Sequence, residues 1–592
     1  MKIYDAIIIG SGAAAYNAAD CLFKNNVKDI VILCESRLHG TSRNTGSDKQ
    51  TYYKISMDGQ GYDSPYKMAT DMVSGGSADG VKAYKHAVNS MRCFLKLFDY
   101  GVNFPRDEFG GFPGYKTDHD DTTRATSVGP LTSKLMTEKL EEVVLSKNKT
   151  PLIDNRLVVE ILTDNGRVCG VTAFDTLNEK VETYYAKNVI AATGAPACIY
   201  KHSVFPVSQH GMTGVMLSSG VRLCNYSQWQ YGMASVDFRW NVSGSFMQVI
   251  PRFVSVDENG CEREFLSDYF DDIHTAYSFV FLKGYQWPFS ADRTKKSSAV
   301  DIAVHSEISK GRKVYLDFRK NPGNFCFDKL CDEAKEYLIR TDCMAETPVE
   351  RLFRLNSKAI DVYMNQGIDL YKDMLRIAVC AQHNNGGVYT DENFMSDIKG
   401  LYVVGEAGGS FGLSRPGGSA LNDTQVSSLV ASDHIAENMK NIPPVTYKKS
   451  IYEDIAENFV TDDTVDYSYI PEKMSECCSF LRDEEKCSAL LSEIEMLLEN
   501  YPEKHRNIEA FFRDRDMLIS ARALLVTVIA EMKKTGSRGG AIFIKDGKAV
   551  KENKYYRDYM TVTGKGETEY VKVSLVSDKY KAFELYLSEI DD

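Results

Sequence analysis

Two glycines and an alanine near the start of the chain have the spacing of a phosphate-binding turn. Gly10, Gly12 and Ala15 follow an apolar run at residues 6–9 and open an alanine-rich helical segment. In such a G-x-G-x-x-A turn the first glycine bends the chain, the second lets a pyrophosphate approach the backbone, and the alanine packs closely. The positive end of the helix then holds the phosphates. The residues expected to contact a dinucleotide are Gly10, Ser11, Gly12, Ala13, Ala14 and Ala15.

An acidic residue stands where this kind of turn requires one. Residues 29–34 predict a second apolar strand, and Glu35 follows it directly. A carboxylate about 20 residues beyond the turn binds a ribose hydroxyl of the dinucleotide. A strand, turn and helix near an N-terminus can also be purely structural. The full order of strand, turn, helix, strand and acid favours a dinucleotide site.

Two further apolar strands end in residues suited to ligand binding. Residues 188–192 lead into Thr193 and Gly194, and residues 400–404 lead into Gly405 and Glu406. Both endings fit the carboxyl edge of a parallel sheet, where ligands bind. The polar loop 39–48 could wrap the middle of a dinucleotide, and a solvated surface loop is the alternative.

The spacing of these strands predicts an inserted domain. About two hundred residues separate them, far more than a loop needs. Residues 225–365 would form this insertion and end in helical patterns near 328–339 and 349–360. Other helical patterns lie at 78–100 and 129–144, and residues 157–162 and 167–174 alternate like a β-hairpin.

The composition of the sequence changes again after residue 445. Charged helical segments at 484–498 and 507–534 precede a tail with strand alternation at 569–576. We therefore expect the α/β fold class with three parts. A Rossmann-type domain would comprise 1–224 and 366–445, an α+β capping domain 225–365, and a C-terminal helical domain with a short β-containing tail 446–592.

The composition narrows the possible partners. The 592 residues exceed what one core holds, and a net charge of -12 argues against nucleic acid, which needs a basic face. No apolar run approaches the length of a membrane span, and no secretory signal is apparent. The 14 cysteines form no C-x-x-C pair, so we expect no metal or iron–sulfur site, but reduced thiols in a cytoplasmic enzyme.

Several motifs recur in a family-specific order. After the turn and the Thr-Gly strand come Gly-Gly-Val-Tyr-Thr-Asp at 386–391, Gly-Leu-Tyr-Val-Val-Gly-Glu at 400–406 and Ser-Arg-Pro-Gly-Gly-Ser-Ala-Leu at 414–421. Gly-Ile-Asp at 367–369 and Ser-Arg-Gly-Gly at 537–540 fit as well. In this order the chain resembles the flavoprotein subunit family of succinate dehydrogenase, fumarate reductase, L-aspartate oxidase and adenylylsulfate reductase.

The resemblance implies FAD and a set of contacts to it. The turn would hold the pyrophosphate, Glu35 the adenosine ribose and Glu406 the ribityl chain. Amides at the start of the helix after residue 418 would face the flavin. Relatives with covalent FAD use a histidine whose position matches Asn44, so noncovalent FAD is expected. Further implied contacts are Ser42, Arg43, Thr45, Gly46, Val158, Gly194, Ala420 and Leu421.

The substrate-binding residues depart from the family pattern. Relatives acting on dicarboxylates use two histidines and two arginines. Arg415 matches one arginine and could grip a carboxylate, or it could tie a loop to a helix. Gly232 replaces the first histidine. Gln382 replaces the second, with His383 displaced by one position, and His383 could be a packed histidine or a site residue reached by local backbone adjustment.

The expected proton donor belongs to the inserted domain. The resemblance implies an arginine there, and Arg293, with Lys295 and Lys296 nearby, is the candidate. A short basic run is also typical of a solvated surface.

These features predict an FAD-dependent oxidoreductase. Hydride would pass between flavin N5 and a small, carboxylate-bearing substrate, as in reduction of an activated C=C bond or its reverse. Arg415, Arg293 and His383 are the candidate catalytic residues. An amino-acid oxidase of the L-aspartate oxidase type, or a flavoprotein subunit passing electrons to an iron–sulfur partner, remains the alternative.

Overall fold

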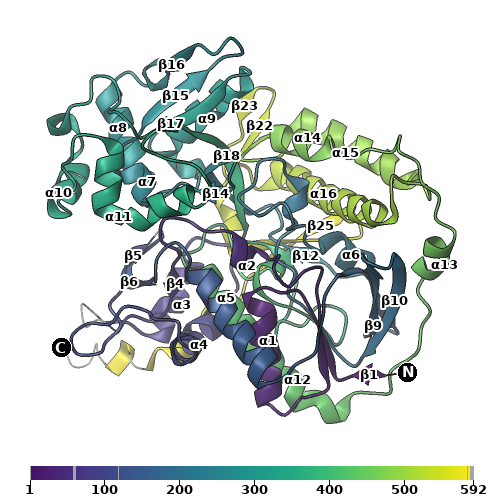
Figure 1. Ribbon diagram of the computed structural model, residues 1–592. Coiled ribbons are helices and arrows are strands. Elements are labelled where there is room, and N and C mark those ends of the chain that lie inside the picture. The colour runs from purple at the N-terminus through teal and green to yellow at the C-terminus, as the bar shows by residue number, and fades with distance from the viewer. Residues whose placement is uncertain (1, 58–61, 118, 583, 587–592) are drawn as a thin grey trace.

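The computed structural model describes residues 2–57, 62–117, 119–582 and 584–586. Three parts are visible in Figure 1: a lower body, a lobe at the upper left, and a group of green and yellow helices at the right. These parts correspond to the nucleotide-binding domain, the inserted cap and the C-terminal region. The expected α/β fold class is confirmed.

A five-stranded sheet forms the centre of the lower body. Its order is β20 (Leu401–Val403), β11 (Val189–Ala191), β2 (Ala6–Ile9), β3 (Ile30–Leu33) and β7 (Leu152–Ile153), and every pair is parallel. These strands are short apolar runs, and all of them except the partly buried edge strand β7 are buried on both faces, as parallel strands require. Strands from opposite ends of the sequence therefore end at one edge, where the predicted ligand residues follow them.

Two helices cover this sheet together. The helix α1 (Ala13–Lys24) packs along α12 (Ser419–Asn438), and Asn17 Nδ2 donates to Ser428 Oγ at 2.7 Å. The alanines of α1 permit this close approach. Other helices of the body are α2 (Thr41–Asn44), α3 (Pro65–Val73), α4 (Gly80–Asp99), α5 (Thr132–Glu142) and α6 (Thr213–Ser218).

The predicted hairpin belongs to a second sheet of the body. Strands β8 (Arg156–Asp164) and β9 (Arg167–Asp175) pair around Asn165 and Gly166, which both have positive φ, as a tight hairpin turn demands. The sheet is completed by β10 (Lys180–Ala186) and β1 (Ile3–Tyr4). A small sheet of β4 (Tyr52–Tyr53), β6 (Asp120–Thr126) and β5 (Tyr115–Thr117) lies below the cap.

The cap contains a six-stranded sheet and five helices among its described residues. The strands, in spatial order, are β14 (Trp240–Asn241), β13 (Trp229–Ser235), β18 (Leu375–Asn384), β17 (Lys313–Asp317), β15 (Arg252–Val256) and β16 (Glu262–Glu264). The helices are α7 (Ser245–Gln248), α8 (Ile273–Leu282), α9 (Ser298–Ser309), α10 (Asp332–Arg340) and α11 (Pro348–Met364). Because β18 pairs with β13 and β17, the cap continues past the expected boundary at 365 to the end of β18.

The C-terminal region is helical with a short β tail, as the sequence predicts. Its helices are α13 (Tyr452–Glu457), α14 (Ile470–Cys477), α15 (Glu484–Glu499) and α16 (Ile508–Lys534). Strands β21 (Leu481–Asp483), β22 (Ile542–Lys545) and β23 (Lys548–Ala549) form one sheet. The tail strand β25 (Glu567–Lys572) ends earlier than the predicted 576, and its partner β24 (Tyr559–Gly564) joins β12 (Leu223–Cys224) of the body.

Candidate active site

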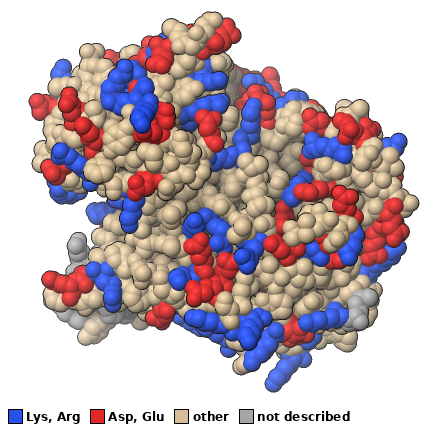
Figure 2. All heavy atoms as spheres, viewed as in Figure 1, with Lys and Arg blue, Asp and Glu red and all other residues tan. Residues whose placement is uncertain are grey.

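A cavity of about 950 Å³ lies between the body and the cap. Its body wall comes from the turn before α1, the end of β3, the loop 39–51, the start of β8, and residues 192–194, 404–406 and 415–424. Its mouth lies between α10 and the β5–β6 segment, where Figure 2 shows a notch below the upper-left lobe. Segments that are distant in the sequence therefore meet around one space.

The turn before α1 has the geometry of a phosphate cradle. Gly10 has φ +122°, and a Cβ there would lie 2.4 Å from the carbonyl oxygen of Ala192, so only glycine fits. Ala15, fully buried, lies beneath it. Among the described residues, none accepts a hydrogen bond from the amides of Ser11 or Gly12. The turn can therefore bind a pyrophosphate through backbone N–H groups.

Glu35 lines the cavity and is held by the C-terminal region. Its Oε2 accepts from Arg513 Nη2 of α16 at 2.7 Å, and Arg513 Nε also donates to Glu509 at 2.8 Å. The position of Glu35 in the cavity lining fits the predicted contact to a ribose. The ion pair between Glu35 and Arg513 was missed from the sequence, because nothing local links residue 513 to residue 35.

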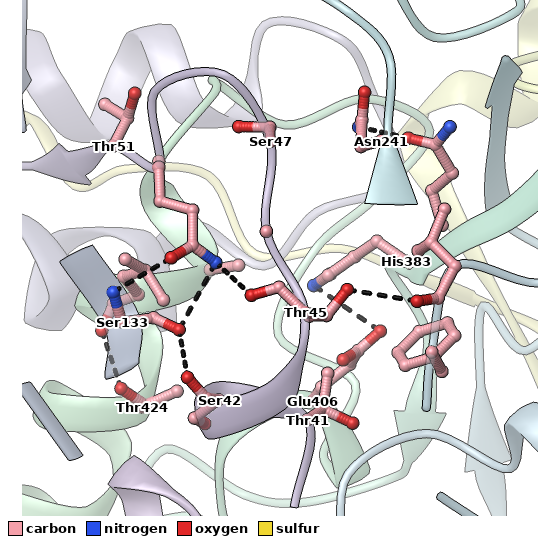
Figure 3. A pocket seen from close by; sticks show the side chains of 18 of the residues that line it. Thr41, Ser42, Thr45, Ser47, Thr51, Ser133, Asn241, His383, Glu406 and Thr424 are labelled. Carbon is pink, nitrogen blue, oxygen red and sulfur yellow. Dashed lines mark hydrogen bonds and ion pairs between the residues drawn. The ribbon is translucent and has the colours of Figure 1, made fainter. Parts of the chain in front are cut away.

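The loop after Glu35 turns some predicted residues toward the cavity and others away. Ser42 Oγ accepts from the amide of Ala13 at 3.3 Å, and Thr45 Oγ1 donates to the carbonyl of Val204 at 3.0 Å. Figure 3 shows Ser42 and Thr45 along the cavity wall. Arg43 instead forms ion pairs with α5, at 2.7 Å to Glu141, so it does not line the cavity.

The start of α12 supplies the opposite end of the cavity. Gly418 has φ +87° and lets the chain turn into the helix, where a Cβ would meet Thr51 at 2.6 Å. Ala420 and Leu421 in the first turn both line the cavity. The amide of Leu421 donates to the carbonyl of Gly418 at 3.1 Å, whereas the amide of Ala420 has no acceptor among the described residues. This end of the helix therefore favours negative charge in the ligand beside it.

Glu406 closes this side of the site. Its Oε1 accepts from the backbone N–H of Asn384 at 2.9 Å, and burial raises the pKa of its carboxyl to about 8. The carboxyl is therefore protonated at neutral pH and can donate a hydrogen bond as well as accept one.

Most of the predicted contact residues line this one cavity. They are Gly10, Ser11, Gly12, Ala14, Glu35, Ser42, Thr45, Gly46, Val158, Gly194, His383, Glu406, Arg415, Ala420 and Leu421. Four predicted residues do not line the cavity. Three of them are Arg43, which pairs with α5, and Ala13 and Ala15, whose side chains are buried in the packing around α1.

The fourth exception is Arg293, the expected proton donor. It ends a short 3-10 helix that begins at Ala291, whose amide bonds to the carbonyl of Gly539 in the C-terminal region. This attachment keeps the segment outside the lining of the cavity. On α10, in contrast, Tyr337 and Arg340 do line it.

A local irregularity in β18 brings His383 to the cavity. Gln230 pairs with His383 and Tyr231 pairs with Ala381, so Gln382 is an extra residue, a β-bulge. Because the bulge re-aims the side chains, both Gln382 and His383 line the cavity. Of the two alternatives left open by the sequence, the geometry corresponds to local backbone adjustment.

Arg415 and His383 are hydrogen-bonded to each other. Arg415 Nε donates to His383 Nδ1 at 3.2 Å, and both side chains are buried. Burial and the neighbouring guanidinium hold the pKa of His383 well below its ordinary value, so the imidazole is neutral. Nδ1 also lies 3.1 Å from Asn385 Oδ1, so this nitrogen contacts both a donor and an acceptor within the protein.

The Nε2 atom of His383 is a polar atom that no protein group satisfies in the described part of the chain. It is buried, lies 3.9 Å from Glu406 Oε1, and has no hydrogen-bond partner among the described residues. Figure 3 shows the ring directed toward Glu406. A buried polar atom without a hydrogen-bond partner indicates a ligand that completes it.

Position 232 has no room for a side chain. A Cβ on Gly232 would lie 3.0 Å from Gln382 Nε2 and 3.1 Å from Trp287. Gln382 Oε1 accepts from Asn241 Nδ2, and Trp287 and Asn241 both line the cavity. Asn241 and Trp287 were not predicted, since neither lies in a motif with recognisable spacing.

The part of the chain that the structure describes contains neither a metal-binding cluster nor a membrane span. No group of three or more His, Cys, Asp or Glu within it could hold a metal ion. None of its helices is long and apolar enough to cross a membrane.

A parallel sheet with a glycine turn, a carboxylate at the end of the second strand and a cap over the shared cavity is the architecture of an FAD-binding flavoprotein. The residues present fit that cofactor, as the unpartnered amides of the turn and the unpartnered Nε2 of His383 indicate. The comparison with protein families agrees: the FAD binding domain model matches residues 5–421, and the chain belongs to that family.

Comparison with individual proteins shows which relatives the chain resembles. It is 25% identical over 590 residues to an uncharacterised FAD-dependent oxidoreductase of Methanocaldococcus jannaschii, covering 95% of this chain and 97% of that protein. It is 24% identical over 457 residues to the fumarate reductase flavoprotein of Escherichia coli, covering 73% and 68%. The predicted kinship with the fumarate reductase and succinate dehydrogenase flavoproteins, the FAD cofactor and the oxidoreductase class are thus confirmed.

A solved quinol-fumarate reductase with menaquinol molecules has the same fold. The two chains superpose with a TM-score of 0.75 at 18% identity, covering 97% of this chain and 99% of that one. The arrangement of body, cap and C-terminal helices is therefore that of this family.

Proposed function

We propose that the protein interconverts an activated C=C bond and the corresponding saturated bond in a small carboxylate-bearing substrate. Bound FAD supplies the two-electron chemistry, in which hydride passes between flavin N5 and a substrate carbon. The chain's own residues bind the substrate, orient it and exclude water.

One observation carries this proposal: Arg415 and His383 are joined by a hydrogen bond in the cavity that the FAD-binding segments also line. A guanidinium matches a carboxylate in charge and geometry. The neutral His383 adds the unpartnered Nε2 atom rather than a second charge. Together they would hold a carboxylate next to the cofactor and draw electron density from a conjugated double bond.

Proton transfer at the second carbon would come from the cap. Tyr337 and Arg340 of α10 line the cavity opposite the body wall. Burial raises the pKa of Tyr337 to about 12, so its hydroxyl stays protonated in the neutral range. Closure of the cap would exclude water and bring these groups to the substrate.

Arg415→Ala tests the carboxylate anchor. With the bound flavin reduced anaerobically, a panel of enoates is added and flavin reoxidation is followed by absorbance. Loss of the guanidinium should lower the rate by about a thousandfold or more, while FAD stays bound. Arg415→Lys should recover part of the rate, and Arg354→Ala, an exposed cap arginine, serves as the control. Unchanged kinetics would remove Arg415 from the site.

The same assay separates the alternatives. Oxygen consumption with peroxide release on amino acids would favour an oxidase. Reoxidation that requires a co-purifying iron–sulfur protein would favour an electron-transfer role within a larger complex. That role is worth testing because the Escherichia coli relative is named as the flavoprotein subunit of its fumarate reductase.

We also propose that FAD is held without a covalent bond. Asn44 is exposed, and its Nδ2 donates to the carbonyls of Leu38 and Gly40, at 2.8 and 3.1 Å. A primary amide is not a nucleophile toward flavin, so acid precipitation should release free FAD. Flavin that stays with the precipitate would contradict this.

A further inference from the structure

The cap side of the cavity carries a cluster of aromatic rings. Phe281 and Tyr285 belong to α8 and the turn after it, Trp287 follows two residues later, and Tyr337 belongs to α10. The ring centroid of Phe281 lies 5.4 Å from that of Tyr337 and 6.4 Å from that of Tyr285, and both pairs are edge-to-face. Such spacing is that of packed aromatic side chains, so three of the rings form one surface.

Trp287 extends this surface toward the substrate-binding residues. Its ring lies 3.1 Å from where a Cβ on Gly232 would be, and the same position lies 3.0 Å from Gln382 Nε2. Both polar atoms of the Gln382 side chain are engaged within the protein, by Asn241 and by the carbonyl of Met233. The space next to Arg415 and His383 is therefore bounded by an indole and a neutral amide.

A buried ion pair fixes the backbone of Trp287. Lys283 Nζ lies 2.7 Å from Asp301 Oδ2, and it donates to the carbonyl of Trp287 at 2.6 Å. Both charged side chains are almost fully inaccessible to solvent. Breaking such a pair is costly, so the segment that carries Trp287 is held in one position.

The charges of the cap do not suit a second carboxylate. Of the cap residues that line the cavity, Glu333 and Glu336 are acidic and Arg340 is basic. Tyr285 Oη donates to Glu333, which holds that carboxylate beside the aromatic cluster. A net negative wall would repel a second anionic group on the substrate.

We propose that the substrate is an aryl-substituted enoate, a monocarboxylate whose far end is an aromatic ring. The carboxylate is bound by Arg415 and His383, and the ring packs against Trp287, Tyr285 and Tyr337. The double bond between them gains a hydride at the carbon next to the ring and a proton at the carbon next to the carboxylate. The reducing equivalents come from reduced FAD, so this inference rests on the proposed function.

The test compares substrates that differ only at the far end. In the holoenzyme reduced anaerobically with dithionite, cinnamate should reoxidise the flavin at a KM about tenfold or more below that of crotonate or fumarate. If crotonate or fumarate is used as well as cinnamate, the aromatic site is wrong and the proposed function stands. If no enoate reoxidises the flavin, the proposed function fails as well.

A variant and a binding measurement locate the effect. Trp287→Ala should raise the KM for cinnamate about tenfold and that for crotonate less than about threefold, while Phe353→Ala, an exposed ring on α11, should change neither. Calorimetry of the oxidised holoenzyme should detect 3-phenylpropionate but not butyrate at equal concentration, without any turnover. An equal effect of Trp287→Ala on both substrates, or equal affinity for the two saturated acids, would overturn the proposal.

Discussion

The body side of the cavity presents mainly backbone groups, whereas the cap side presents side chains. The turn before α1 offers amides around Gly10 and Gly12, and the first turn of α12 offers the amide of Ala420. The cap offers rings, amides and a few charges. A backbone site demands glycine at fixed positions, and such a requirement is easily visible in a sequence.

The difference explains how one fold serves several substrates. The glycine turn has little freedom to change, because a Cβ at Gly10 would lie 2.4 Å from the carbonyl oxygen of Ala192. Side chains such as Gln382 and Trp287 can be replaced without disturbing the parallel sheet, because they lie on a bulged strand and on a turn of a separate cap. Substrate preference can therefore diverge while FAD chemistry is kept.

Gly10→Ala should have the largest effect on FAD binding. A Cβ would lie 2.4 Å from the carbonyl oxygen of Ala192, which is backbone in the central sheet and cannot move aside. The flavin-to-protein ratio after purification should fall at least about tenfold, and the melting temperature should drop.

Gly260→Ala is the matched control for this prediction. Gly260 also has positive φ, +81°, but nothing lies within 4 Å of its Cβ position. The variant should cost about 1 kcal/mol of stability from backbone strain and should keep its flavin. Equal flavin loss in both variants would mean that strain alone, and not the close approach, governs binding.

Arg513→Ala should weaken FAD binding through Glu35. Arg513 Nη2 holds Glu35 Oε2 at 2.7 Å, so its loss leaves the ribose carboxylate without its partner from α16. Since a charge-assisted hydrogen bond contributes about 1.5–3 kcal/mol and this one is partly exposed, we expect about a tenfold rise in the Kd for FAD.

Titration of the apoprotein with FAD measures this effect. Arg515→Ala is the control, because Arg515 lies on the same helix but donates to Tyr452 Oη at 3.1 Å, away from the cavity. An unchanged Kd in Arg513→Ala would show that the C-terminal region does not support the adenosine end of the site.

Local rules predicted the fold well. The hairpin, the parallel strands and the long helices α4, α15 and α16 follow from residue periodicity and turn residues that act over a few positions. The expected cap boundary at 365 precedes β18, which joins the cap sheet by pairing with β13, more than a hundred residues earlier. A local sequence pattern does not reveal such a pairing.

Site residues that belong to sequence motifs could be predicted, whereas those that only tertiary packing brings to the cavity were missed. Arg43 sits inside a predicted contact loop, yet Glu138 and Glu141 on α5 draw it away from the cavity. Trp287 carries no motif, and only the tertiary structure brings it beside Gly232. The bulge at Gln382 explains why a one-residue displacement still leaves His383 at the site.

Glu406 gives the most specific test of the FAD side, because the change concerns a single carboxyl group. Burial raises the pKa of its carboxyl to about 8 from an ordinary value of 4.5. Between these two pH values the folded apoprotein binds more protons than the unfolded chain, so its free energy of unfolding falls as pH rises, and the effect ends above about pH 8.

Glu406→Gln should remove this contribution, because an amide does not titrate in this range. Urea denaturation of both apoproteins at pH 5, 6.5 and 8 should show the wild type losing stability relative to the variant by at most about 1.4 kcal/mol per pH unit. Other buried acids, such as Asp516, titrate in both proteins and cancel in the difference. Parallel pH profiles would mean that Glu406 is ionised in the folded apoprotein, and that it can only accept hydrogen bonds from the cofactor.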